Sequence, residues 1–231
     1  MKKISLAFLF IISAMLCFGQ TNFSRGEALF MQNKPKEAVV FLENSISDDP
    51  AHVMAFLYLG IVYEQLGRTD EAISAYRRIL PRAGNHTAHV ANNLGNVYFQ
   101  KGDINNALQF YSQALEYNSV YSAAYLGRAN TRIKAGSLRE AVSDYEQYLA
   151  LEPRSQQRAK IEQLINVIRS EVAAEERRKL IAEEEERLRA QQRQRLLDEI
   201  SASLQSAADS SKGLSTGAED VEGYDSEFEL E

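Results

Sequence analysis

Small and aromatic residues recur in the same order about every 34 residues along the first two thirds of this chain. One set consists of Gly60, Tyr63, Gly67, Ala72 and Tyr76. The next set consists of Gly95, Tyr98, Gly102, Ala107 and Tyr111, and a third of Ala129, Gly136, Ala141, Tyr145 and Pro153. A period of this length predicts an all-α solenoid of stacked helical hairpins, an architecture that favours binding over catalysis.

Residues 53–86 show why each type recurs. Gly60 and Tyr63 fall on one side of a helix predicted near 53–66, where the small Gly60 allows a partner helix to approach closely. Gly67 is typical of a helix end. Ala72 and Tyr76 repeat the small-then-large order on the next helix, so the segment predicts two helices that fold back on each other.

This pattern resembles the tetratricopeptide repeat, whose signature has a Leu-Gly pair, a Tyr three residues later, then Ala, a large residue and Pro. The resemblance implies four copies, at 19–52, 53–86, 88–121 and 122–155. The first copy is degenerate, and it keeps Gly26, Leu29, Ala38, Leu42 and Pro50. No copy has the family's tryptophan, whose place is taken by Phe56, Ala91 and Tyr125.

Residues 1–19 have the composition of an export signal. Lys2 and Lys3 precede an apolar run from 4 to 18 that is shorter than the ~20 residues of a membrane span, and Gly19 precedes a predicted cleavage site. An uncleaved anchor and a lipoprotein lipidated at Cys17 are the alternatives, although Leu16 is a poor match to a lipoprotein signal. We expect a bacterial protein of the periplasm or cell envelope that loses its single cysteine on export.

Two helical segments are predicted after the repeats. At 156–170, a capping helix presents one apolar stripe of Ile161, Leu164, Ile165 and Ile168. At 171–200, an extended charged helix has Glu and Lys or Arg four residues apart. Glu184 and Gln191 interrupt its apolar positions, so we predict a solvated single helix, with a coiled coil between chains as the alternative.

The acidic residues behind the net charge of −6 are concentrated at 201–231, a segment that is also rich in Ser, Gly and Ala. This composition predicts a disordered acidic tail. Tyr224, Phe228 and Leu230 could form a docking motif within it, although a solubilising role is the simpler interpretation. The near-neutral repeats offer no basic face, so we expect no nucleic-acid partner.

Catalytic and cofactor chemistry is not indicated. His86 and His89 have a helical spacing, but no Cys or acidic cluster accompanies them, so we expect no metal site. The chain has no nucleophile motif and no Gly-rich phosphate loop. We therefore expect neither an enzyme nor a bound cofactor.

The family resemblance implies a concave groove that binds a protein or peptide partner. Its predicted lining is Met54, Leu57, Ile61, His89, Asn92, Asn96, Phe99, Leu126 and Asn130. The three asparagines, expected to face solvent, could pair with the main chain of an extended peptide, or could be ordinary surface polarity. The basic residues with which some relatives bind a terminal carboxylate are absent from these positions.

Arg128 and Arg132 occupy positions that are apolar or aromatic one copy earlier, so we expect them to be paired, with Asp144 as a partner of Arg128. Taken together, these features predict a non-enzymatic adaptor of the bacterial cell envelope, compatible with peripheral envelope association. The alternative is a structural protein that self-associates through the 171–200 helix.

Overall fold

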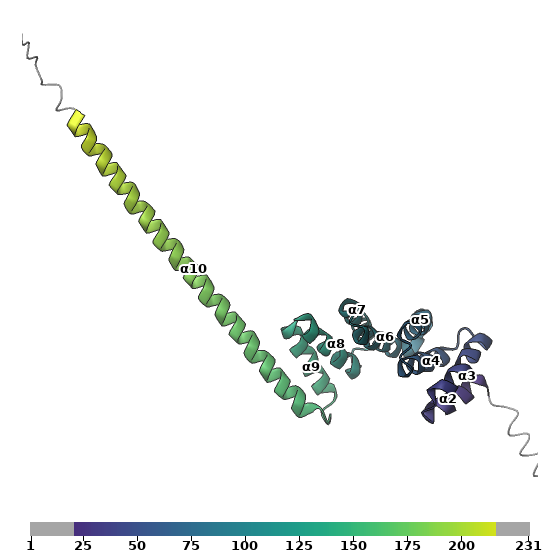
Figure 1. The fold of residues 1–231 in the computed structure, drawn as a ribbon. Helices are drawn as coiled ribbons and strands as arrows, with labels where there is room; N and C mark the ends of the chain where they lie inside the picture. The colour runs from purple at the N-terminus through teal and green to yellow at the C-terminus, as the bar shows by residue number, and fades with distance from the viewer. Residues whose placement is uncertain (1–20, 216–231) are drawn as a thin grey trace, which may run out of the picture. The chain divides into compact units, whose positions relative to one another are not determined.

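The computed structural model describes residues 21–215, and these residues form helices and short connections without any strand. The elements, shown in Figure 1, are α2 (Asn22–Met31), α3 (Pro35–Asp48), α4 (Val53–Gln65), α5 (Thr69–Ile79), η1 (Leu80–Arg82), η2 (Gly84–His86), α6 (Thr87–Lys101), α7 (Ile104–Tyr117), α8 (Ser122–Ala135), α9 (Leu138–Leu151) and α10 (Arg158–Ser215). The predicted all-α class is confirmed. The predicted export signal lies outside the described residues.

Helices α2 to α9 form four consecutive hairpins, in which α2 packs on α3, α4 on α5, α6 on α7 and α8 on α9. The second helix of each hairpin contacts the first helix of the next. The first helices also contact one another in sequence, α2 with α4, α4 with α6 and α6 with α8. This contact order is that of a solenoid.

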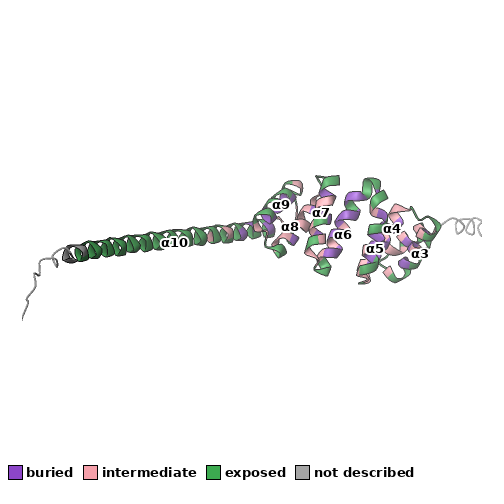
Figure 2. Ribbon diagram, turned by 90° about the horizontal axis from the view of Figure 1, so that it is seen from above, coloured by how far each residue is buried: buried purple, intermediate pink, exposed green. Residues whose placement is uncertain are grey.

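The chain divides into two compact units after Val172. We call residues 21–172 the repeat unit and residues 173–215 of α10 the distal helix, and each is described by itself. Figure 2 shows buried residues throughout the repeat unit, whereas the distal helix is coloured almost entirely as exposed.

The hairpin turns depend on left-handed backbone conformations. Gly67, Gly102 and Gly136 have φ values of 71°, 79° and 77° where the first helix of a hairpin ends. The degenerate first hairpin has Asn33 at the equivalent place, with φ of 56°. Asparagine tolerates this region better than other residues with a side chain, so the first hairpin keeps the turn without glycine.

Close helix approach is confirmed at Gly60 and Gly95, the first recurring glycine of each set. A Cβ atom added to Gly60 would lie 2.3 Å from the Tyr76 ring, and one added to Gly95 would lie 2.7 Å from the Tyr111 ring. Each tyrosine belongs to the second helix of the same hairpin. Both rings are almost fully buried, so the glycines make room for the largest side chains of the core.

Helix α10 covers the last hairpin with its first turns. Ile161, Ile165 and Ile168 are buried in one apolar cluster with residues of α9, including Tyr145 and Leu149. Leu164, which the sequence placed on the same stripe, remains 37% exposed. The stripe that contacts the repeats is therefore narrower than predicted.

The predicted end of the charged helix near residue 200 is wrong, because α10 is one helix of 58 residues that continues to Ser215. The segment 201–211 contains Ala, Leu and Gln, which are good helix formers, and the next Gly is Gly213. The acidic residues that indicated disorder lie mostly beyond it. Residues 216–231, the rest of the predicted disordered tail, lie outside the described residues.

Candidate functional site

A groove of about 430 Å³ runs along the first helices of the third and fourth hairpins. Helix α6 supplies four of its lining residues, α7 one and α8 four: Asn92, Asn96, Phe99, Gln100, Tyr111, Ala123, Leu126, Gly127 and Asn130. The structure thus brings together five of the nine predicted groove residues, namely Asn92, Asn96, Phe99, Leu126 and Asn130. The candidate site is a surface rich in amides with apolar side chains between them.

Two of the amides are held in place by tyrosines. The Tyr111 hydroxyl donates to Asn96 Oδ1 at 2.8 Å, and the Tyr145 hydroxyl donates to Asn130 Oδ1 at 2.6 Å. Burial raises the pKa of both hydroxyls above the ordinary tyrosine value, so they stay neutral donors. Because each carbonyl is already engaged, the NH₂ groups of Asn96 and Asn130 are the donors left for a partner.

The second hairpin uses a different acceptor for its tyrosine. Ile61 stands where the later hairpins have asparagine, and the Tyr76 hydroxyl donates instead to Glu64 Oε1 at 2.6 Å. Burial raises the pKa of the Glu64 carboxyl, although the hydrogen bond from Tyr76 acts in the opposite direction. The amide pattern is therefore confined to the third and fourth hairpins.

The expectation that Asn92 faces solvent is wrong, since its exposed fraction is only 5%. Helix α6 contacts α4, α7 and α8, so little of it reaches the surface. Asn92 Nδ2 donates to Asn93 Oδ1 at 3.4 Å, whereas Asn92 Oδ1 is buried without a hydrogen-bond partner. A buried acceptor without a partner is unfavourable, so Asn92 is the polar group in the groove wall that would gain most from a donor.

A cation lies near the apolar part of the groove. Lys134 Nζ is 4.1 Å from the centroid of the Phe99 ring, a distance suited to a cation–π contact. Phe99 and Leu126 are both half-buried, so each keeps part of its surface for contact with a partner. Lys134 is exposed and adds positive charge beside this apolar patch.

The other four predicted residues do not line the groove. Leu57 is buried in the core, while Met54 and Ile61 are half-buried against that core. His89 is exposed, and its ring meets the Tyr121 ring edge-on with centroids 4.9 Å apart. The prediction placed the whole α4 face in the groove, but its apolar side chains pack inward.

Of the four other groove residues, Ala123 is at a family groove position, whereas Gln100, Tyr111 and Gly127 are not and were not predicted. Gly127 had a usable signal, because it is a glycine at a position outside the repeat signature. A Cβ atom added there would lie 2.4 Å from the Tyr111 ring of the preceding hairpin. Gly127 therefore lets Tyr111 lie between α6 and α8 and form part of the groove floor.

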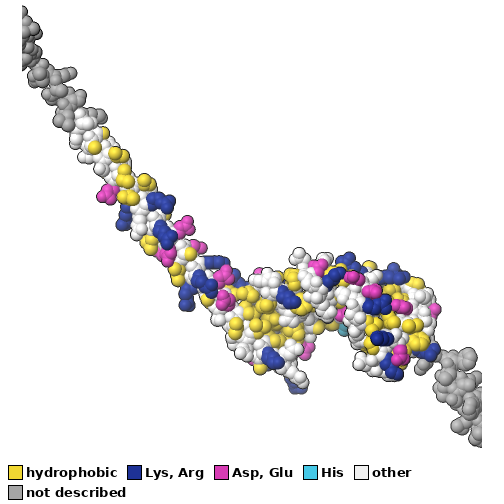
Figure 3. Space-filling view, viewed as in Figure 1, with side chains coloured by type: hydrophobic (Ala, Val, Ile, Leu, Met, Phe, Trp, Pro, Cys, Tyr) yellow, Lys and Arg dark blue, Asp and Glu magenta, His cyan; other side chains and the backbone are white. Residues whose placement is uncertain are grey.

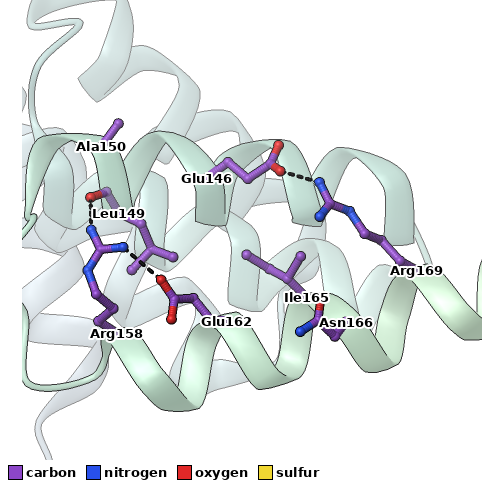
Figure 4. Close-up of a pocket in the computed structure, with 8 residues that line it drawn as sticks. All are labelled: Glu146, Leu149, Ala150, Arg158, Glu162, Ile165, Asn166 and Arg169. Carbon is purple, nitrogen blue, oxygen red and sulfur yellow. Dashed lines mark hydrogen bonds and ion pairs between the residues drawn. The ribbon is translucent and has the colours of Figure 1, made fainter.

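A second hollow, of about 500 Å³, lies where α9 meets the start of α10 (Figure 4). Arg158 donates to Glu162 at 2.8 Å and to the Leu149 carbonyl at 2.6 Å, and Arg169 pairs with Glu146. The charged groups around this hollow thus bind one another and attach the capping turns to α9. For that reason, we consider the groove between α6 and α8 the better candidate for a partner.

Among residues 21–215 there is no group of three or more His, Cys, Asp or Glu side chains arranged so that it could hold a metal ion. Within the same range, no helix has the length and apolarity needed to cross a bilayer.

Comparison with known proteins identifies the repeats. Tetratricopeptide-repeat family profiles match residues 52–119 and 92–157, which together span α4 to α9. The chain is a tetratricopeptide-repeat protein. The predicted resemblance is confirmed.

Among its relatives, this tetratricopeptide-repeat protein is 30% identical over 107 residues to a probable UDP-N-acetylglucosamine–peptide N-acetylglucosaminyltransferase, SPINDLY, of Hordeum vulgare. The match covers 44% of this chain and 11% of that protein. The curated relatives are much longer, since the match to protein FlbA of Caulobacter vibrioides covers only 20% of that protein.

Solved structures show the same fold. The crystal structure of MamA is 20% identical, with a TM-score of 0.58 over 64% of this chain and 84% of MamA. That of YrrB, described as having an unusual peptide-binding site, is 23% identical, with a TM-score of 0.50 over 57% of this chain and 68% of YrrB.

Proposed function

We propose that this tetratricopeptide-repeat protein is a non-enzymatic adaptor that binds an extended segment of another protein in the groove between α6 and α8. The arrangement of the groove carries the proposal: amide donors of Asn96 and Asn130, the buried acceptor of Asn92, and apolar surface from Phe99 and Leu126. An extended peptide offers main-chain donors and acceptors together with side chains, so it suits such a mixed surface.

The peptide-binding site named for YrrB supports this proposal, because it is found in a protein with the same repeat fold. The Lys134 cation over the Phe99 ring indicates which side chains the bound segment should carry. We expect the bound segment to carry an aliphatic or aromatic side chain, with an acidic residue next to it.

We further propose that the protein acts in the bacterial cell envelope after export. This proposal rests on the sequence of residues 1–19, with Lys2 and Lys3 before an apolar run. N-terminal sequencing of protein made in a bacterial host tests it, and the expected first residue is Gln20. A chain that still begins at Met1, or a lipid on Cys17, would overturn cleavage after Gly19.

Selection from a library of random short peptides, followed by titration of a selected peptide, tests the groove. Ala123 is exposed and lines the groove, whereas Ala135 is exposed on the same helix outside it. Ala123→Gln should weaken binding by about tenfold or more, equivalent to about 1.4 kcal/mol, because the longer side chain occupies the groove. Ala135→Gln is the matched control and should bind like the parent.

Circular dichroism and urea denaturation should show both variants folded, since Gln is a good helix former at an exposed position. Equal affinity of the two variants for the selected peptide would contradict the assignment of this groove.

A further inference from the structure

The distal helix exposes large aliphatic side chains that a helix surrounded by water does not need. Their exposed fractions lie between 46% and 66%. The seven residues are Leu180, Ile181, Leu188, Leu196, Leu197, Ile200 and Leu204. Figure 3 shows hydrophobic side chains interspersed with charged ones along this helix. Apolar surface repeated over so many turns is typical of an interaction site.

Charges on the same helix are arranged in blocks. Residues 177–179 are basic, and residues 183–186 are four consecutive glutamates. Arginines follow at 187, 189, 193 and 195, and Asp198 and Glu199 come next. The order basic, acidic, basic, acidic is therefore reversed when the helix is read from its other end.

We propose that the distal helix pairs with the distal helix of a second copy of this chain in an antiparallel arrangement centred between Leu188 and Arg189. With a rise of about 1.5 Å per residue, such a pair places residues 183–186 level with residues 191–194 of the second copy. The basic block 177–179 comes level with Asp198 and Glu199. The glutamate block and the basic block 177–179 thus lie beside segments of opposite charge or of uncharged residues, whereas Arg187 and Arg189 at the centre lie near their own equivalents.

The same register brings aliphatic side chains together. Ile181 lies level with Leu196 of the second copy, and Leu188 lies within one residue of its own equivalent at the centre. Between these layers, Glu185 lies level with Gln192 of the second copy, which can donate to it. The aliphatic contacts supply the attraction, while the charges select the orientation.

A parallel pair in register is disfavoured by the same charges. It would place the four glutamates of one copy beside those of the other, and the arginines beside arginines. Like charges across a helix interface are destabilising and determine partner orientation in paired helices.

Ion pairs within the helix do not prevent this arrangement. Lys179 bonds Glu175 at 2.7 Å and Arg187 bonds Glu184 at 2.6 Å, yet all four side chains remain at least half exposed. Exposed pairs of this kind contribute little, so their side chains can also face a second copy. The inference is independent of the groove, because it uses no residue of the repeat unit.

Position-specific disulfide formation tests the orientation, in the full chain carrying Cys17→Ser so that no other thiol is present. Ile181→Cys and Leu196→Cys chains are mixed and oxidised. The antiparallel pair predicts a disulfide between the two kinds of chain and little between chains of one kind. Leu188→Cys should cross-link with itself and serves as the oxidation control.

Sedimentation of the uncross-linked protein tests the association itself. Leu188→Asp should convert a dimer to a monomer, whereas Ala190→Asp, about 200° further around the helix, should not. Circular dichroism should show equal helix content in the two variants. A parent that is monomeric at all concentrations would overturn the proposal, as would disulfides that join 181 to 181 and 196 to 196.

Discussion

Arg128 of α8 binds both carboxylate oxygens of Asp144 of α9, with Nε 2.9 Å from Oδ2 and Nη2 2.8 Å from Oδ1. Arg132 adds a second guanidinium to the same carboxylate, and Arg128 also donates to Ser112 of α7. The side chain of Asp144 is only 3% exposed. This bidentate pair confirms the partner predicted for Arg128 and connects the third and fourth hairpins through one buried network.

Asp144→Asn should destabilise the repeat unit by about 3–5 kcal/mol, because the two guanidinium groups would lose the charge that compensates their burial. Glu146→Gln, on the same helix at an exposed position, is the control and should change the free energy of unfolding little. Urea denaturation of both variants is the measurement. A small effect of Asp144→Asn would mean that water can replace the carboxylate.

The arrangement of hairpins could be predicted because each recurring residue has a local physical role. Gly67 and Gly102 need a left-handed backbone, and Gly60 needs space beside Tyr76, so type and spacing alone locate the helices. The outward or inward direction of Asn92 could not be predicted in this way. It depends on how closely the neighbouring hairpins cover α6, which no single copy encodes.

The role of Gly127 was missed for a related reason. Its constraint comes from Tyr111, which belongs to the preceding hairpin, so a signature defined within one copy does not contain it. The length of α10 was misjudged because composition was averaged over 201–231, where helix formers precede an acidic segment.

Gly127→Ala should destabilise the protein by about 1–3 kcal/mol, since its Cβ atom would overlap the Tyr111 ring. The effect should be largely relieved when Tyr111→Leu is also present, because the smaller side chain vacates that space. Denaturant unfolding of the two single variants and the double variant gives the coupling free energy.

Gly102→Ala is the control for this comparison of single and double variants. It has open space around its Cα but a φ of 79°, so it should cost about 1–2 kcal/mol through backbone strain alone. Its effect should add to that of Tyr111→Leu without coupling. If neither glycine substitution shows coupling to Tyr111→Leu, Gly127 does not act by making room for the Tyr111 ring.

Glu64→Gln should change the pH dependence of stability. Because burial raises the pKa of Glu64 in the folded state, its contribution to stability is complete below the unfolded pKa of about 4.3 and is lost as the pH rises through the folded pKa. Glutamine keeps an acceptor for the Tyr76 hydroxyl without the buried charge. The variant should therefore match the parent near pH 4 and be more stable at pH 7.

Urea denaturation of Glu64→Gln and parent across this pH range is the measurement. The exposed Glu116→Gln supplies the comparison, and its difference from the parent should stay small throughout. A Glu64→Gln variant that is less stable than the parent at neutral pH would show that the ionised carboxylate is stabilising where it lies.

Ile165 and Leu164 are adjacent in α10, but only Ile165 is buried against the last hairpin, so the two residues together test the capping contact. Ile165 is 4% exposed and packs with α9, whereas Leu164 is 37% exposed. Ile165→Ala should cost about 2–5 kcal/mol, because it leaves a cavity at the end of the solenoid, while Leu164→Ala should cost much less.

Because each hairpin of a solenoid is stabilised by its neighbours, loss of the cap should act first on the last hairpin. Hydrogen exchange should therefore show faster exchange in α8 and α9 of Ile165→Ala, with α4 and α5 close to the parent. Uniform acceleration over all four hairpins would instead indicate that the repeat unit unfolds as one cooperative unit, and no change at all would mean that α10 does not cap it.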